Sequence, residues 1–272
     1  MVKKIYTWGG KFANRNYTVD DLIKAKGKKK LIQTTATSTE EAEAVNNAEF
    51  DMLLCKSPLI KDVRLGAPNT FLTATIDLSN FVTVDDILKE AFKAMKDGAD
   101  QVYTARGPHI VEVLAKEEIP VMCHLGLVPR KSGWIGGLRA VGATSEEALD
   151  LFNKFKTMEN AGAISAESEV IHEKIMTEIT KRTSLLTSSL GSGRNGDIIY
   201  LFQNDICGEE ENIPRHARAF GNIYKLKQKI KAERILALKK FKNAVFEKNF
   251  PNDKEIVKIN NVEFEKFMSH IK

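Results

Sequence analysis

Ionisable and polar residues follow several apolar, strand-length segments of this 272-residue chain. In a parallel barrel the carboxyl ends of the strands meet at one mouth, and the reacting groups of barrel enzymes lie there. The residues in question are Thr35, Lys56, Ser57, Asp77, Tyr103, Arg106, His124, Glu169, Ser192 and Arg194. Because polar side chains at such positions are costly to bury unless they are paired, a converging set of them indicates a site.

The elements that must position this set alternate in type along the chain. Apolar runs of strand length are separated by amphipathic segments of helix length, which is typical of a parallel sheet with crossover helices. The predicted strands are residues 31–36, 51–55, 70–76, 101–105, 120–124, 163–169, 185–191 and 198–202. Eight strands are the number that closes a (β/α)8, or TIM, barrel, so the predicted fold class is α/β.

Capping signals mark where several helices begin. Ser38 and Thr144 are each followed three residues later by a glutamate, the pattern of a capping box. Beyond Pro214 the sequence predicts a C-terminal helical segment over residues 214–250, followed by a peripheral tail at 252–272. Without an internal repeat or a low-complexity linker, the whole chain, residues 1–272, is expected to form one barrel domain.

Composition excludes several classes of protein. With 43% apolar and 28% charged residues, the chain can bury a full core, and disorder is excluded as its main state. No apolar run approaches the roughly 20 residues of a membrane-spanning helix. The first residues lack a signal-peptide pattern, and three scattered cysteines fit a reducing compartment, so we expect a soluble, cytoplasmic protein. The net charge of +5 comes without a nucleic-acid-binding module, so we expect neither nucleic acid nor membrane as a partner.

One segment carries a specific pattern. His-Leu-Gly-Leu-x-Pro at residues 124–129 precedes Gly-Gly-x-x-x-x-Gly at 136–142, and the chain resembles ketopantoate hydroxymethyltransferase there. The similarity continues at residues 18–22, 190–193 and 249–251. The resemblance implies a homo-oligomeric barrel of the phosphoenolpyruvate mutase and isocitrate lyase superfamily. It also implies transfer of a one-carbon unit from 5,10-methylenetetrahydrofolate to a 2-oxo acid, 3-methyl-2-oxobutanoate, in pantothenate biosynthesis.

That reaction needs a base for the α-proton and positive charge beside the enolate oxygen. The family supplies the charge as Mg²⁺, held by carboxylates that follow the second, third and fourth strands. By resemblance, Asp77 is the only surviving ligand, because Lys56 and Ala105 occupy the other two positions. Mg²⁺ prefers a near-octahedral shell of oxygen ligands, so we expect no tightly held Mg²⁺ ion.

The resemblance also assigns roles to residues. It places the general base at Glu169, although Glu167 competes if the register slips, and it makes His124 a group that positions the substrate. Lys56 and Arg106 are expected to replace the ion by binding the substrate carboxylate and enolate oxygen, since one charge pair at about 4 Å is worth on the order of 4 kcal/mol before desolvation. The further expected substrate-binding residues are Thr35, Ser57, Asp77 and Tyr103.

Other interpretations remain open at this point. Lys56 could instead form a Schiff base in a metal-free lyase or aldolase, its pKa lowered by Arg106. Lys56 could also be structural, in a salt bridge with Asp77, and His124 could be a satisfied core histidine. Finally, the chain could be a non-catalytic paralogue that binds an anionic metabolite or a partner protein.

Overall fold

Eight parallel strands form a closed barrel in the computed structural model, which describes residues 3–271. Their order around the barrel is β10-β3-β4-β5-β6-β7-β8-β9, so each strand lies beside its sequence neighbour. Their bounds are β3 Leu31–Thr35, β4 Met52–Lys56, β5 Phe71–Thr75, β6 Gln101–Thr104, β7 Val121–Gly126, β8 Ser165–Glu169, β9 Leu186–Leu190 and β10 Ile198–Tyr200. The predicted TIM barrel is confirmed.

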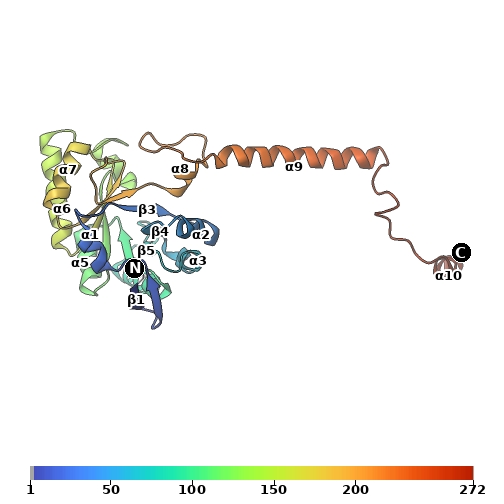
Figure 1. The fold of residues 1–272 in the computed structure, drawn as a ribbon, viewed down its shortest axis with the longest axis horizontal. Helices are drawn as coiled ribbons and strands as arrows, with labels where there is room; N and C mark the ends of the chain where they lie inside the picture. Colours follow the sequence, from blue (N-terminus) through green and yellow to red (C-terminus); the bar gives the residue numbers. More distant parts are fainter. Residues whose placement is uncertain (1–2, 272) are drawn as a thin grey trace.

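Helices surround the barrel on its outer side (Figure 1). They are α1 Val19–Ala25, α2 Thr39–Asn47, α3 Ile60–Gly66, α4 Val84–Asp97, α5 Pro108–Lys116, α6 Ser145–Asn160 and α7 Glu173–Arg182, with short helical turns η1 Ser57–Leu59 and η2 Pro129–Ile135. The apolar faces of α2 to α7 pack against the outward-facing residues of the strands in one large core, whereas Leu22 of α1 joins a separate cluster at the amino-terminal ends of the strands. This packing, rather than helix propensity alone, holds the ring of helices in place.

The predicted N-caps of α2 and α6 differ from capping boxes in one detail. Ser38 and Thr144 each accept a hydrogen bond from the backbone N–H three residues later. The Glu41 carboxylate, however, accepts from the backbone N–H of Thr37 rather than from that of Ser38. In both helices the reciprocal bond therefore reaches the residue before the cap, as Glu147 does with Ala143.

The interior of the barrel changes character from one end to the other. Near the amino-terminal ends of the strands it is apolar, with a buried cluster of Leu22, Leu31, Met52, Phe71, Leu186 and Ile198. Near the carboxyl ends the buried residues are largely polar, and they include Tyr103, His124, Glu167 and Tyr200. Because successive residues of a strand alternate between its two faces, these side chains share the interior. The polar half is where the chemistry can occur.

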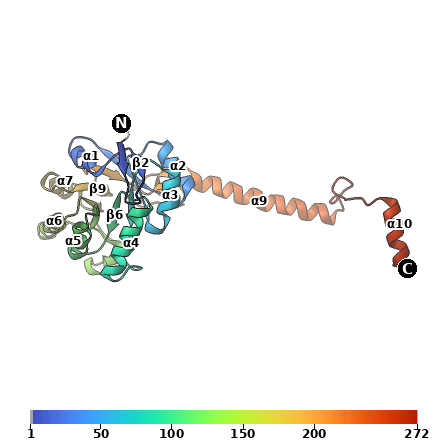
Figure 2. The same cartoon turned by 90° about the horizontal axis from the view of Figure 1, so that it is seen from below.

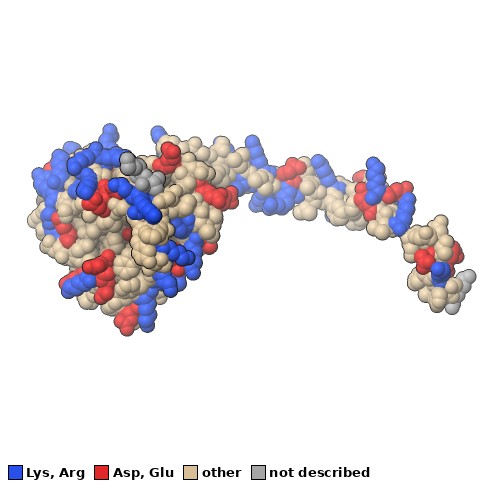
Figure 3. Space-filling view, turned by 60° about the horizontal axis from the view of Figure 1, so that its bottom comes forward, with Lys and Arg blue, Asp and Glu red and all other residues tan. Residues whose placement is uncertain are grey.

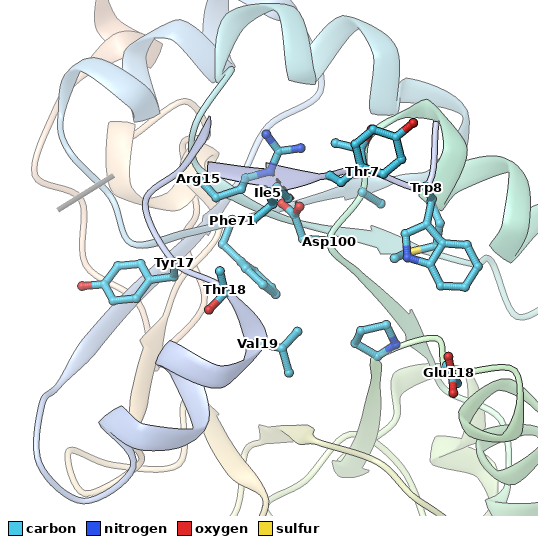
Figure 4. Close-up of a pocket in the computed structure, with 14 residues that line it drawn as sticks. Ile5, Thr7, Trp8, Arg15, Tyr17, Thr18, Val19, Phe71, Asp100 and Glu118 are labelled. Carbon is cyan, nitrogen blue, oxygen red and sulfur yellow. Dashed lines mark hydrogen bonds and ion pairs between the residues drawn. The ribbon is translucent and has the colours of Figure 1, made fainter. Parts of the chain in front are cut away.

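A β-hairpin that the sequence analysis did not predict lies at the opposite end. Strands β1 Lys3–Tyr6 and β2 Phe12–Arg15 pair antiparallel. Together with the neighbouring strand starts they line a pocket (Figure 4). Arg15 forms a salt bridge with Asp100 at 2.7 Å inside this pocket. Its guanidinium also donates to the backbone carbonyls of Asn14 and Pro68. These contacts hold the hairpin against the amino-terminal end of the barrel, so we interpret this pocket as structural.

The C-terminal part of the chain leaves the barrel. After α8 Gln203–Cys207, helix α9 Ile223–Phe246 projects away from the barrel, and α10 Asn261–His270 lies beyond it (Figures 1 and 2). The long helix thus begins at Ile223 rather than near Pro214. Residues 214–222 instead fold back onto α8, where the backbone N–H groups of Phe220 and Gly221 donate to the carbonyl of Ile206. Residues 252–272, predicted as a tail, contain α10 within their described part.

On the face shown in Figure 3, basic and acidic side chains both occur over the barrel and along the arm, with basic side chains more frequent along the upper edge of the barrel. None of the helices in residues 3–271 combines the length and apolarity needed to cross a membrane.

Candidate active site at the barrel mouth

Two neighbouring strands bring an imidazole and two carboxylates together. In the β7–β8 register His124 lies opposite Glu167, and Gly126 lies opposite Glu169. The Nε2 atom of His124 is 3.0 Å from Oε2 of Glu169 and 3.7 Å from Oε1 of Glu167. The side chains of His124, Glu167 and Glu169 are 4%, 6% and 12% exposed, so the cluster is buried and opens toward the mouth at Glu169.

Tyr103 on β6 orients the imidazole from its other side. Its hydroxyl lies 2.6 Å from Nδ1 of His124, a hydrogen bond within the barrel interior. This contact occupies Nδ1 and leaves Nε2 facing the two carboxylates. Although Nε2 lies within ion-pairing distance of Glu169, its N–H direction meets no acceptor in hydrogen-bond geometry among the described residues. Tyr103 therefore positions His124, and Nε2 remains available.

Burial and mutual charge shift the ionisation of this cluster. Burial by itself would lower the pKa of His124, but the carboxylates of Glu167 and Glu169 outweigh it, and the pKa is raised. Burial raises the pKa of Glu167 to about 7, with the neighbouring Glu169 adding to the effect and His124 opposing it. A carboxyl group that titrates near neutral pH suits acid–base chemistry.

Asp77 has a different partner from the one predicted. Its carboxylate pairs with Arg130 of η2 through two hydrogen bonds, at 3.0 and 3.1 Å, and it also accepts from the backbone N–H of Ser79. The Arg130 contact, followed by the Ser79 contact, lowers the pKa of Asp77 to about 2. Of the interpretations left open for Lys56, the structural salt bridge with Asp77 is not formed, because Arg130 binds that carboxylate.

The two predicted anion-binding cations are placed differently. Lys56 ends β4 on the strand face that points into the barrel, and its side chain is exposed, with no ion pair or hydrogen bond to the part of the chain described. Arg106, by contrast, donates to the backbone carbonyls of Leu78 and Phe81 at 2.8 and 2.6 Å. Arg106 thus anchors the loop after β5 through Nη2, whereas its buried Nε has no partner among the described residues.

Two further cations near the mouth were missed by the sequence analysis. Arg130 and Lys131 directly follow the His-Leu-Gly-Leu-x-Pro pattern, and that adjacency was the available signal. Lys131 donates to the backbone carbonyl of Ala105 at 2.6 Å, at the end of β6. Burial, together with the nearby Arg106, lowers the pKa of Lys131.

Two of the remaining predicted residues have structural contacts. The Thr35 hydroxyl accepts from the backbone N–H of Gln203 and so fixes the start of α8. Ser192 is structural too, since its hydroxyl donates to the Ser168 carbonyl and accepts from the Ile171 N–H. Polar atoms without a partner in the described structure, in contrast, occur within two residues of the carboxyl ends of four consecutive strands: Ser57 Oγ, Thr75 Oγ1, Arg106 Nε and His124 Nε2. Unsatisfied buried groups of this kind are rare and indicate a place for a polar ligand.

The fold and this cluster define a (β/α)8-barrel enzyme with acid–base groups at the carboxyl ends of its strands. Residues 56–253 match the family model of ketopantoate hydroxymethyltransferase, and the chain belongs to that family of transferases.

Individual relatives agree with this assignment. The chain is 28% identical over 267 residues to the 3-methyl-2-oxobutanoate hydroxymethyltransferase of Thermosipho melanesiensis, covering 89% of this chain and 98% of the relative. It is 32% identical over 235 residues to the protein of the same name from Pyrobaculum islandicum, covering 77% and 89%. A solved structure of a putative phosphonomutase from Burkholderia cenocepacia superposes with a TM-score of 0.52 at 9% identity, over 82% of this chain and 100% of that chain, which shows a shared fold.

The Mg²⁺ ion implied by the family resemblance does not fit the matching positions here. A lysine ammonium at Lys56 has no lone pair to offer, and Ala105 has no polar side-chain atom. Asp77, the third position, is paired with Arg130. This donor set cannot supply the oxygen shell that Mg²⁺ requires.

Proposed function

We propose that this chain catalyses the family reaction without the family's Mg²⁺ ion. A one-carbon unit from 5,10-methylenetetrahydrofolate would be transferred to a 2-oxo acid, 3-methyl-2-oxobutanoate, through its enolate, as a cytoplasmic step toward pantothenate. The observation that carries the proposal is the buried His124–Glu169 contact at 3.0 Å, set beside partnerless polar atoms at the ends of neighbouring strands. Three cysteines without disulfides are consistent with a reducing compartment.

The residues of the mouth divide the work. Glu169 removes the α-proton of the 2-oxo acid, because it is the member of the cluster most open to the mouth. His124, held by Tyr103, stabilises the Glu169 carboxylate and orients it. The developing enolate and the substrate carboxylate are bound by Lys56, whose ammonium has no ion pair within residues 3–271, with Ser57 Oγ as a further donor.

Glu169→Gln tests this assignment. We expect wild-type protein to exchange the α-proton of 3-methyl-2-oxobutanoate with D₂O in the presence of a chelator. The glutamine variant should exchange it roughly 100-fold more slowly, because general-base catalysis contributes about that much. Proton NMR of the substrate measures the rate. Exchange that persists in the variant would remove Glu169 as the base, and exchange abolished by the chelator would show that a metal is required.

The Schiff-base alternative has less support from the geometry. A lysine nucleophile is activated by burial or by an adjacent cation. Lys56 is exposed, and Arg106 is bound to two backbone carbonyls. Borohydride reduction with substrate, followed by mass measurement, is expected to leave Lys56 unmodified. A non-catalytic paralogue would fail the exchange assay altogether.

We also propose that the chain forms a homo-oligomer through its C-terminal arm. Helix α9 has no buried residue, and its exposed side chains include Leu226, Ile230 and Phe241. On the barrel, the outer faces of β3 and β10 remain open at Ile32 and Ile199, which are 40% and 36% exposed. Two unpartnered apolar surfaces of one chain can cover each other between copies.

A further inference from the structure

The cluster of His124, Glu167 and Glu169 has the composition of a metal site as well as of a base. One ligand atom from each residue lies within 4.8 Å of the others. The three residues come from adjacent barrel strands, and none of the matching family ligand positions is among them. An imidazole nitrogen with two carboxylates is a donor set suited to a borderline transition-metal ion such as Zn²⁺, rather than to Mg²⁺.

The spacing of the ligand atoms fits a small tetrahedral ion. Bonds of about 2.0 to 2.2 Å place the ligand atoms of such an ion about 3.3 to 3.5 Å apart. The observed distances from His124 Nε2 are 3.0 Å to Glu169 and 3.7 Å to Glu167, on either side of that value. Shifts of a few tenths of an ångström would bring both of these distances to that value, and the two carboxylate ligand atoms lie within 4.8 Å of each other.

A second observation points to a ligand at the same place. His124 is almost fully buried, and its Nε2 has no hydrogen-bond partner among the described residues although it faces the carboxylates. Its Nδ1 is bound to the Tyr103 hydroxyl. Metal-binding histidines typically have their second ring nitrogen hydrogen-bonded in this way, which fixes the ring and the tautomer.

Charge balance is compatible with an ion as well. A metal-bound imidazole is neutral, so in the occupied site the two glutamates carry two negative charges, and isolated buried charges are costly. One divalent cation neutralises both, so the cluster would become electrically neutral without protonating either glutamate.

We propose that His124, Glu167 and Glu169 bind one divalent transition-metal ion of the Zn²⁺ class, and that this ion inhibits the enolisation proposed above by occupying Glu169. The second half rests on the proposed function, whereas the first half does not. The ion and the α-proton compete for the same carboxylate, so metal binding inhibits the reaction.

Isothermal titration calorimetry with Zn²⁺ on the full-length chain tests the binding half. We expect one ion to bind per chain. Loss of a group that only hydrogen-bonds a metal ligand weakens metal affinity by up to roughly 100-fold, so Glu167→Gln, which removes a ligand itself, should weaken it by more. Tyr103→Phe removes such a partner and is expected to weaken binding about 10-fold. Substituting Co²⁺ should produce visible absorption bands that depend on His124 and Glu167.

Asp77→Asn is the matched control, because it removes the carboxylate at the family's metal position and leaves the cluster intact. We expect it to bind Zn²⁺ with wild-type affinity. Thermal unfolding of each variant checks that it is folded. Zn²⁺ binding that is absent in the wild type, undiminished in Glu167→Gln, or lost only in Asp77→Asn would overturn the proposal.

Activity separates this inference from the proposed function. Zn²⁺ is expected to suppress α-proton exchange, and a chelator to restore it. Zn²⁺ binding in a protein that shows no exchange under chelator would overturn the proposed function and the inhibition, but not the metal site. Exchange in a protein that does not bind Zn²⁺ would overturn the metal site and the inhibition, but not the proposed function. Exchange that increases with Zn²⁺ would overturn both the inhibition and the metal-free reaction.

Discussion

At the scale of single residues, some polar side chains near the mouth are bound to other protein groups, whereas others have polar atoms free to bind a ligand. Tyr103 and Arg130 are bound to His124 and Asp77 respectively. In contrast, Nε2 of His124, which faces the two glutamates, and the exposed ammonium of Lys56 have no hydrogen bond among the described residues. Such a division is expected of a binding site, because the side chains that meet a ligand cannot also be satisfied by the protein.

Replacing Tyr103 with phenylalanine tests its positioning role. We expect a loss of about 1 to 3 kcal/mol in unfolding free energy, because Nδ1 of His124 would remain buried without a partner. Denaturant unfolding measures the change. Tyr200→Phe, a buried tyrosine on β10, serves as the control and should cost less, since no hydrogen bond of its hydroxyl to a described residue is formed.

The pH dependence of stability tests Glu167. Because burial raises its pKa to about 7 from 4.5, the folded state binds this proton more tightly than the unfolded state does. Its protonation therefore stabilises the fold at low pH, and that contribution is lost as the pH rises from about 4.5 through about 7.

Glu167→Gln cannot ionise, so the variant should gain stability relative to wild type as the pH increases, by on the order of 1 to 3 kcal/mol at pH 8. Metal-free protein unfolded at pH 5 and pH 8 provides the comparison. A difference between variant and wild type that is the same at both values would contradict the raised pKa.

At the scale of elements, strand register decides which residues meet, and hydrogen-bonded side chains fix the connections. Glu159 at the end of α6 shows how a turn is held: its carboxylate accepts from Thr183 and from both the backbone N–H and the hydroxyl of Ser184, next to the start of β9. Lys156 adds an ion pair at 2.9 Å.

Glu159→Gln should weaken that connection. Although burial would raise the pKa of Glu159, hydrogen bonds from Ser184 and Lys156 lower it to about 2. The stabilisation is present above the unfolded pKa of about 4.5 and is lost as the pH falls through about 2. Discounted for solvent screening, we expect a loss of about 1 kcal/mol at pH 7 that shrinks toward zero near pH 2. Thermal unfolding at both pH values measures it, and a loss independent of pH would contradict it.

At the scale of the whole molecule, the barrel and the arm differ in how they are stabilised. The barrel buries a continuous core, whereas α9 projects from it with apolar side chains exposed (Figure 2). A helix of this kind has little tertiary packing of its own within the described chain, and such packing is the main source of helix stability in proteins.

Charges placed on the arm should therefore dissociate the proposed oligomer. We expect Leu226→Asp combined with Ile230→Asp to yield monomers, because both side chains are about half exposed in the single chain and would be buried between copies. Light scattering coupled to size exclusion measures the mass. Lys231→Ala on the same helix is the control and should leave the mass unchanged, while a wild-type monomer would contradict the arm's proposed role.

The sequence by itself determined the barrel, because the period of its apolar residues and its capping signals are local properties that each strand and helix carries. The predicted strands agree with the observed ones to within two residues at either end. The sequence also placed His124 and Glu169 at the mouth, through a resemblance to a family whose model the chain matches.

Only the tertiary structure decided how these groups are paired. Arg130, not Lys56, binds Asp77; Arg106 is bound to backbone carbonyls; and Glu167 joins His124 and Glu169 rather than replacing one of them. Such pairings depend on distances between strand ends and on loops that return across the mouth. Side chains far apart in the chain acquire their partners, and so their charge states, only when the barrel closes and removes them from water.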